Sequence, residues 1–279
     1  MTTVAAESLS TPSRTWSRYR HLESTIRFAV ILAILAFLGW SVAFLNIDLS
    51  RVLGAFPRLA EILATRYFPP DVGYVTDADF VRSVIRTLEM SLLGGFLGVV
   101  CSIPLAWLAA RNITISRRIA YPFGRLAIIG SRSIHETIWT ILFVTVLGFG
   151  MLAGTLALTV FCIGFAGKLF SDELEAIDMG PVEALRSVGA NPLQVFQYAV
   201  FPQVRVAFTG IAIYTWDVAF RAATVVGFFG GGGMGWYLKR TTQQLESTRV
   251  AAILLVIIGL VLLAEVGSGW LRKKIGRMR

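Results

Sequence analysis

The chain has 279 residues, of which 55% are hydrophobic and 15% charged. Because a soluble domain carries about a quarter charged residues, this composition excludes an ordinary soluble protein and predicts an all-α polytopic membrane protein. The formal net charge of +9 lies in short segments beside apolar runs, unlike the continuous basic face of a nucleic-acid-binding protein. Both cysteines, Cys101 and Cys162, lie within apolar runs, so no disulfide is expected.

The first 80 residues contain one predicted span and a polar loop. Residues 1–25 form a basic tail, and residues 26–46 are apolar over about the twenty positions that a bilayer requires. In the loop at 47–80, six apolar residues recur at helical spacing: Leu49, Val52, Leu53, Phe56, Leu59 and Leu63. They predict an interfacial amphipathic helix that ends by Pro69-Pro70, with an ordinary surface loop as the alternative.

Residues 81–271 are predicted to form the transmembrane core, which contributes five further spans. Four of these spans are predominantly apolar, at about Thr87–Ala110, Met151–Phe170, Val204–Phe228 and Val250–Trp270. A basic tail follows at 272–279. Together with the first span the core makes about six, so both termini are expected on the same side of the membrane.

The third span is the least regular of the six. No charged residue occurs from Thr137 to Gly167, and glycines near position 150 mark a turn within this stretch. The part before the turn, Thr137–Leu147, covers only about half a bilayer, so the span is expected to reach back to about Ile128. This extension puts three polar or charged residues inside the membrane: Arg132, His135 and Glu136.

Basic segments fall on one side in this arrangement. The N-terminal tail, the loop at 111–125 and the C-terminal tail are rich in Arg and Lys and share that side, whereas the loop at 47–80 is acidic and lies on the other. The positive-inside rule therefore puts both termini and the polar loop at 175–202 in the cytoplasm.

The polar loop at 175–202 has the signals of two short helices joined by a turn. Gly180-Pro181 stops the preceding segment, Glu183 and Ala184 start the first helix, and Gly189 with Asn191-Pro192 ends it. A second amphipathic turn, from Val195 to Val200, precedes the next apolar run. In a membrane protein, such an ordered element on one side of the bilayer typically presents a surface to a partner.

Three patterns that suggest catalysis or nucleotide binding are incomplete. His135-Glu136 begins a zinc-protease motif, but Trp139 stands where its second histidine belongs. The glycines after the fifth span match a dinucleotide-binding pattern without its βαβ unit, and Lys168 is not followed by the Ser or Thr of a P-loop. No metal, no cofactor and no enzymatic activity are therefore expected in this chain, and any ATP must be bound by another subunit.

Charged residues inside the membrane are the remaining candidates for function. Arg132 and Glu136 are spaced i,i+4, as are Asp217 and Arg221, so each pair is expected on one helix face. Two interpretations stay open: each pair neutralises itself and ties helices together, or its members line a transport path. An arginine that faces such a path would suit an anionic substrate, because phosphoryl oxygens accept its forked donors well.

Three stretches together resemble the permease subunits of phosphonate ABC importers: Arg132 to Val144, Gly180 to Pro202, and Arg221 to Tyr237. The middle stretch is similar to the EAA loop of binding-protein-dependent transport permeases, in which this loop is the coupling helix that docks onto the ATPase subunit. The similarity rests on Glu183-Ala184 and on a glycine six residues after the Glu. One departure is Leu185, at a position where a second alanine is common.

The resemblance implies a type I importer permease with the MetI-like fold in the cytoplasmic membrane. It also implies a second copy of the permease, two cytoplasmic ATPase subunits that bind ATP and Mg, and an extracytoplasmic phosphonate-binding protein. Phosphonate, phosphite or phosphate would be the substrate. The alternative is a secondary transporter of small anions that is driven by protons through Glu136, His135 or Asp217.

The resemblance implies three sets of site residues. Coupling to the ATPase is expected from Gly180, Pro181, Glu183, Ala184, Leu185, Ser187, Gly189, Ala190 and Pro192. The translocation path is expected to include Arg132, Ser133, His135, Glu136, Asp217, Arg221 and Thr224. A gate near the outer side of the membrane is expected from Gly230, Gly231, Gly232, Gly233 and Gly235.

Overall fold

The structure is a computed structural model that describes residues 21–45 and 49–276. All regular elements in this described part are helices. The chain divides into two compact units, Met1–Ile62 and Leu63–Arg279. Within the described residues, five helical runs are long and apolar enough to cross a membrane: Thr25–Phe44, Ala78–Ala109, Met151–Glu175, Pro192–Gly231 and Ser247–Gly276.

The first unit contains α1 (His21–Phe44) and α2 (Leu49–Ile62). The apolar side chains of α1 from Ile26 onward are exposed, as suits a helix whose surroundings are hydrocarbon. Helix α2 covers most of the predicted amphipathic segment, and its location at the membrane interface stays a prediction. Of the predicted tails at 1–25 and 272–279, residues 1–20 and 277–279 lie outside the described residues.

The second unit is a bundle of long helices with short connecting helices. Its α-helices are α3 (Val72–Thr76), α4 (Ala78–Ala109), α5 (Ala120–Ser133), α6 (Glu136–Leu147), α7 (Met151–Glu175), α8 (Gly180–Ser187), α9 (Pro192–Val195), α10 (Phe201–Val226), α11 (Met234–Gln243) and α12 (Ser247–Gly276). Three π-helical segments complete it, at Leu63–Tyr67 (η1), Phe196–Val200 (η2) and Gly227–Gly231 (η3).

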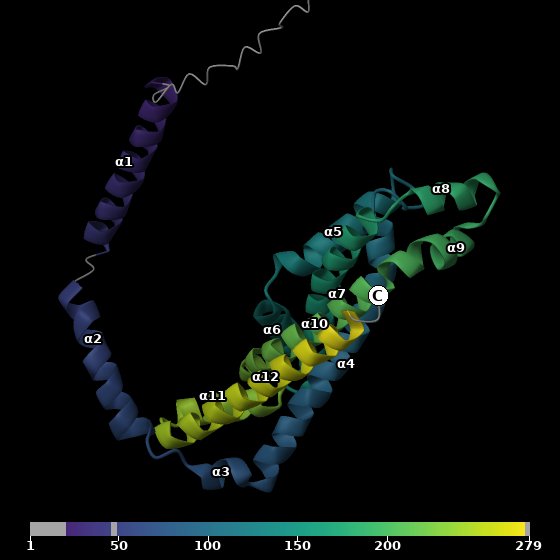
Figure 1. The fold of residues 1–279 in the computed structure, drawn as a ribbon. Helices are drawn as coiled ribbons and strands as arrows, with labels where there is room; N and C mark the ends of the chain where they lie inside the picture. The colour runs from purple at the N-terminus through teal and green to yellow at the C-terminus, as the bar shows by residue number, and fades with distance from the viewer. Residues whose placement is uncertain (1–20, 46–48, 277–279) are drawn as a thin grey trace, which may run out of the picture. The chain divides into compact units, whose positions relative to one another are not determined.

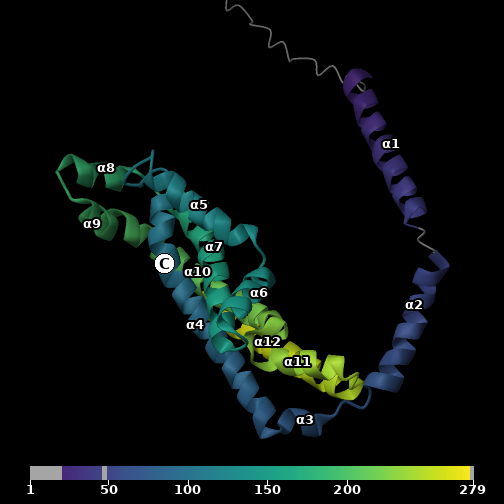
Figure 2. The same cartoon turned by 180° about the vertical axis from the view of Figure 1, so that it is seen from behind.

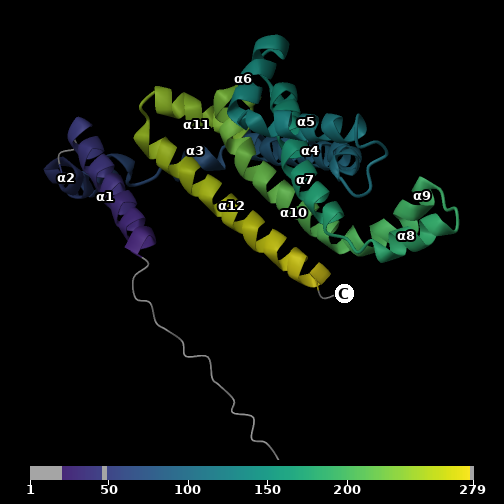
Figure 3. The same cartoon turned by 90° about the horizontal axis from the view of Figure 1, so that it is seen from above.

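Helices α4, α7 and α10 pack against one another and form the centre of this unit (Figure 1). Helix α12 runs beside α10, as Figure 3 shows from above. The short helices α8 and α9 lie at one end of the unit, and α3 and α11 lie at the opposite end (Figure 2). The candidate coupling loop and the glycine-rich turn before α11 are therefore at opposite ends of the bundle.

Small residues allow α4 and α7 to approach closely. A Cβ atom at Gly94 would lie 2.8 Å from Cβ of Leu158, and one at Gly98 would overlap the side chain of Cys162. Glycines four residues apart on one helix face are typical of tightly packed membrane helices, because they let two backbones come together. This contact explains why the second and fourth predicted spans are neighbours in the bundle.

The prediction of a continuous third span from Ile128 is wrong. The chain forms α5 and α6 there, and Ile134 and His135 between them adopt extended backbone angles. A ring nitrogen of His135 accepts a hydrogen bond from the backbone N–H of Thr137 at 3.4 Å, so the histidine caps the new helix. This capped break divides the expected span into two helices of 14 and 12 residues.

Candidate functional site

The predicted coupling loop forms two short helices, α8 and α9, joined by a tight turn. Pro181 lies in the first turn of α8, where the absence of an N–H costs nothing. The carboxylate of Asp178 accepts the Gly180 N–H at 3.0 Å, so this backbone donor at the start of the helix has a partner. The predicted end of the helix near Gly189 is confirmed, whereas the helix starts at Gly180, three residues before the predicted start at Glu183.

Gly189 ends α8 with a positive φ of +80°, a conformation that strongly favours glycine. The N–H of Gly189 donates to the Arg186 carbonyl and that of Ala190 donates to the Leu185 carbonyl, both at 3.1 Å. These two bonds satisfy carbonyls that the end of the helix would otherwise leave unpaired.

A capping box starts α9. The Asn191 side chain accepts the Gln194 N–H at 2.8 Å, and the Gln194 side chain accepts the Asn191 N–H at 2.9 Å. Pro192 occupies the first helical position, which its fixed φ suits. The turn between the two helices is therefore held by backbone geometry at Gly189 and by side-chain bonds at Asn191.

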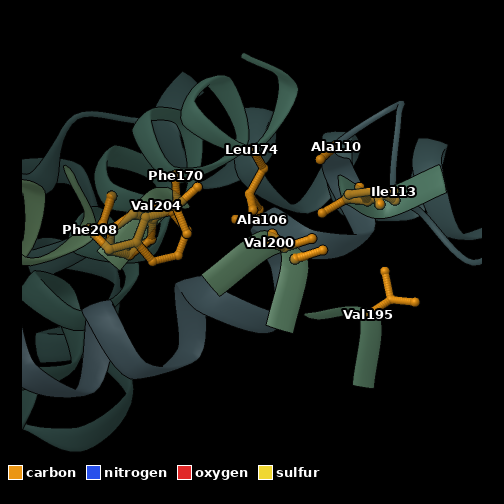
Figure 4. Close-up of a cluster of buried hydrophobic side chains, with 12 residues drawn as sticks. Ala106, Ala110, Ile113, Phe170, Leu174, Val195, Val200, Val204 and Phe208 are labelled. Atoms are coloured by element: carbon orange, nitrogen blue, oxygen red, sulfur yellow. The ribbon is translucent and has the colours of Figure 1, made fainter. Parts of the chain in front are cut away.

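One side of the loop is anchored in a hydrophobic cluster at this end of the bundle (Figure 4). The loop contributes buried Val182, Val195 and Val200. The bundle contributes residues of α4, α7 and α10, among them Phe170 and Phe208, whose rings stack with centroids 4.2 Å apart. The loop is thus packed directly against the ends of three long helices.

The opposite side of the loop is exposed to solvent. It carries the predicted coupling residues Glu183, Ala184 and Ser187, together with two large apolar side chains. These two are Val188, which is 77% exposed, and Leu193, which is 71% exposed. Large apolar side chains exposed on an ordered loop are available for contact with another protein.

Polar side chains that the sequence analysis did not single out hold the base of the loop. Gln203 accepts the Asp178 N–H at 3.0 Å and donates to the Ala199 carbonyl at 2.7 Å. Glu175, at the end of α7, pairs with the Arg125 guanidinium at 2.6 Å and accepts the Arg111 N–H at 2.9 Å. Apart from the bond of Gln203 to Ala199, no local spacing pattern predicts these contacts, because the others join residues that are 25 to 64 positions apart.

The prediction that Arg132 and Glu136 lie on one helix face is wrong, because the break between α5 and α6 separates them. Glu136 instead lies 3.3 Å from Nε2 of His135. The stem of Arg132 packs on α7 at Gly164, where a Cβ atom would lie 2.7 Å from the arginine Cγ. Ser133 is also a predicted path residue, and its hydroxyl donates to the Ile129 carbonyl at 2.7 Å.

The second predicted pair is present on one face of α10. Nη2 of Arg221 donates to Oδ2 of Asp217 at 2.9 Å, with side-chain exposures of 42% and 3%. The other carboxylate oxygen of Asp217 is buried without a hydrogen-bond partner among the described residues. Thr224, also predicted on the path, donates to the Arg221 carbonyl at 2.8 Å. The pair thus joins a buried anion to a guanidinium that is partly open to its surroundings.

The glycine-rich turn connects α10 to α11 through η3. Gly230, Gly232 and Gly233 have positive φ angles of +109°, +86° and +69°. The Gly230 carbonyl accepts the Gly150 N–H at 3.1 Å, and the Met234 N–H donates to the Thr87 hydroxyl at 2.8 Å. Bare glycine backbone therefore lets this turn pack against the beginning of α7 and against α4.

Metal-ligand geometry is not seen within residues 21–45 and 49–276. No three His, Cys, Asp or Glu side chains in these ranges come together as metal ligands would. His135, which begins the incomplete zinc-protease motif, has its Nδ1 3.0 Å from the Thr137 hydroxyl.

A comparison with protein families gives a match over most of the second unit. Residues 102–277 match the binding-protein-dependent transport system inner membrane component. The chain belongs to this family. It is therefore a membrane permease subunit, and the family predicted from the three sequence stretches is confirmed.

Two similar permeases have names that refer to phosphorus oxyanions. The phosphite transport system permease protein PtxC of Stutzerimonas stutzeri is 40% identical over 246 residues, which cover 88% of this permease and 87% of that one. The phosphate-import permease protein PhnE of Mycolicibacterium smegmatis is 36% identical over 220 residues, which cover 79% of this permease and 41% of PhnE. The D-methionine permease MetI of Escherichia coli is 28% identical over 162 residues, or 55% and 72% of the two chains.

Solved structures show the fold of the permease. An inward-facing MetNI methionine ABC transporter aligns with a TM-score of 0.62 at 24% identity, covering 70% of this permease and 95% of that chain. A chain of a bacterial ABC transporter involved in the import of alginate aligns with a TM-score of 0.59 at 16% identity. The alignment covers 92% of this permease and 99% of that chain. The predicted MetI-like permease fold is confirmed by these alignments.

The permease has a cavity of about 390 Å³ beside the loop of α8 and α9. Trp107 of α4 and Arg186 of α8 lie on its wall, and the Trp107 ring packs on Phe196 with centroids 4.3 Å apart. The loop thus borders empty space on this side, whereas its contacts within the hydrophobic cluster are closely packed.

Proposed function

We propose that this chain is the permease of an ATP-driven importer of phosphorus oxyanions, a group that includes phosphonate, phosphite and phosphate. The names of its relatives support this substrate class. The observation that carries the transport mechanism is the two-sided loop of α8 and α9, which is buried on the bundle side and exposed on the other.

In the proposed complex, two copies of the permease form a dimer and each α8 docks onto a cytoplasmic ATPase subunit. The ATPase subunits bind ATP and Mg. When they close, they displace α8, and the buried valines carry this motion to α4, α7 and α10. An extracytoplasmic binding protein delivers the oxyanion while the permease is open to the outside.

The charged pair on α10 is proposed to belong to the translocation path. Arg221 is partly exposed although it lies on a membrane-spanning helix, and a charge in that position is stable only beside polar groups or water. Its free donors suit phosphoryl oxygens, while Asp217 fixes the orientation of the guanidinium. The glycine turn from Gly230 to Gly235 is the proposed gate.

Uptake by proteoliposomes tests this function. The permease, its ATPase and its binding protein are reconstituted, and accumulation of labelled phosphite is followed with ATP or with an imposed proton gradient. We expect accumulation that requires ATP and the binding protein. Accumulation that persists without ATP and follows the proton gradient would instead favour a secondary transporter.

A further inference from the structure

A second cavity lies at the end of the bundle opposite the loop of α8 and α9, next to the glycine turn. Its volume is about 380 Å³, within the range of small-ligand sites. Helix α4 lines one wall with Asp79, Arg82 and Arg86, and Gly150, Gly232 and Trp236 line the others. The cavity thus joins segments that are far apart in the sequence.

The α4 wall carries two guanidinium groups four residues apart, so both lie on one helix face. Arg82 uses one nitrogen, Nη1, in a 3.0 Å bond to Asp79, which leaves its other donors free. The guanidinium of Arg86 forms no hydrogen bond or ion pair with any other residue that the structure describes. With two arginines and one aspartate, the charged side chains of the cavity carry a net positive charge.

Part of the opposite wall is bare backbone. Gly232 and Gly233 have positive φ angles and no side chains, so a ligand can approach the main chain closely. The position of this turn is fixed, because the neighbouring Met234 N–H is bonded to the Thr87 hydroxyl at 2.8 Å. The cavity is therefore small, preformed and positively charged, and it adjoins the proposed gate.

We infer that this cavity binds a tetrahedral phosphorus oxyanion at the outer mouth of the permease, before the substrate reaches the path on α10. Two arginines with free donors match the oxygens of phosphite, phosphonate or phosphate. Phospholipid headgroups offer the same phosphoryl chemistry, and the soluble substrate is the source assigned here. The inference rests on the proposed function, which puts this end of the bundle outside the cytoplasm.

Protection of an engineered cysteine tests the inference without transport. Met151, on the cavity wall, is changed to cysteine in a Cys101→Ala background; native Cys162 is fully buried and stays unreactive. The full chain is placed in nanodiscs of zwitterionic lipid, and the rate of labelling by a neutral maleimide is measured with increasing phosphite. Chloride at the same ionic strength is the reference.

We expect phosphite to slow labelling and Arg86→Gln to raise the half-protecting concentration by about tenfold or more. Arg240→Gln is the matched control, because Arg240 is an exposed arginine of α11 that does not line the cavity. Equal melting temperatures for the three proteins would exclude a folding defect. The inference is overturned if phosphite gives no protection, or gives the same protection after Arg86→Gln.

Two further results separate the possible explanations. Protection that appears only when anionic phospholipid is added, with no effect of phosphite, would identify a headgroup site and overturn the assignment to substrate. ATP-driven uptake without protection by phosphite would overturn the anion site in this cavity and leave the proposed function standing. Protection without ATP-driven uptake would support the anion site and count against the proposed function.

Discussion

At the scale of single residues, Gly189 shows how backbone conformation sets a functional turn. No heavy atom lies within 4 Å of a Cβ atom built at this position, so a side chain there meets open space. Its φ of +80° nevertheless costs an L residue about 1–2 kcal/mol. A substitution at Gly189 therefore strains the turn between α8 and α9 without disturbing the packed cluster beneath it.

We expect Gly189→Ala to lower ATP-driven uptake about fivefold or more, because strain of this size shifts the loop away from its docking conformation. The ATPase rate of the complex, measured in parallel, should lose its dependence on binding protein. Gly210→Ala is the matched control, since Gly210 also has open space around it but lies within α10 with no left-handed φ. Equal uptake in the two variants would contradict the role of Gly189.

The pair of Asp217 and Arg221 allows a structural role to be separated from a role in transport. Arg221→Ala leaves a buried carboxylate without its partner, and we expect it to destabilise the permease by about 1–3 kcal/mol. The double variant Asp217→Asn, Arg221→Gln removes both charges and should restore the melting temperature. Because we propose that Arg221 also contacts substrate, we expect uptake by the double variant to stay low. Normal uptake by the double variant would show that the ion pair serves only to stabilise the permease.

At the scale of elements, the contact between α4 and α7 depends on glycines that leave no room for a side chain. Gly98 faces Cys162, and a Cβ atom would also lie 3.0 Å from the Thr159 carbonyl oxygen. We expect Gly98→Ala to destabilise the bundle by about 1–3 kcal/mol through overpacking. The destabilisation is measured as a lower melting temperature in detergent. Gly259→Ala, in open space on α12, should leave the melting temperature unchanged or raise it.

Local patterns predicted the elements whose signals are short-range. Gly189 marked the end of α8, and the i,i+4 spacing of Asp217 and Arg221 predicted that they share one helix face, where they form an ion pair. The break between α5 and α6 was missed, because Ser133, Ile134 and His135 include neither glycine nor proline and a histidine cap is an uncommon signal. Long-range contacts such as Glu175 with Arg125 have no local spacing that reveals them.

At the scale of the whole molecule, the two ends of the second unit are chemically different. The end with α8 and α9 exposes apolar side chains on an ordered loop, whereas the end with α11 contains the charged cavity and the glycine turn. Neither cavity could be predicted from the sequence, because each is lined by residues from separate elements. The positive-inside rule assigns the first end to the cytoplasm.

We expect cysteines at the two ends to be labelled from opposite sides of the membrane. In a Cys101→Ala background, Val188→Cys should react with an impermeant maleimide only after spheroplasts are opened. Leu245 lies in the turn between α11 and α12 and is 86% exposed, so Leu245→Cys should react in intact spheroplasts. The reverse pattern would contradict the cytoplasmic location of the loop and of both termini.

Co-purification tests most directly the central claim that α8 and α9 dock onto an ATPase. The tagged permease is expressed with its ATPase and purified in mild detergent, as wild type and with Val188→Asp or the control Leu245→Asp. Val188 and Leu245 are both exposed apolar residues, at opposite ends of the bundle. We predict near-equal amounts of ATPase with wild type and Leu245→Asp, and loss of the ATPase with Val188→Asp. A permease that purifies alone and still moves phosphite in vesicles without ATP would contradict the claim.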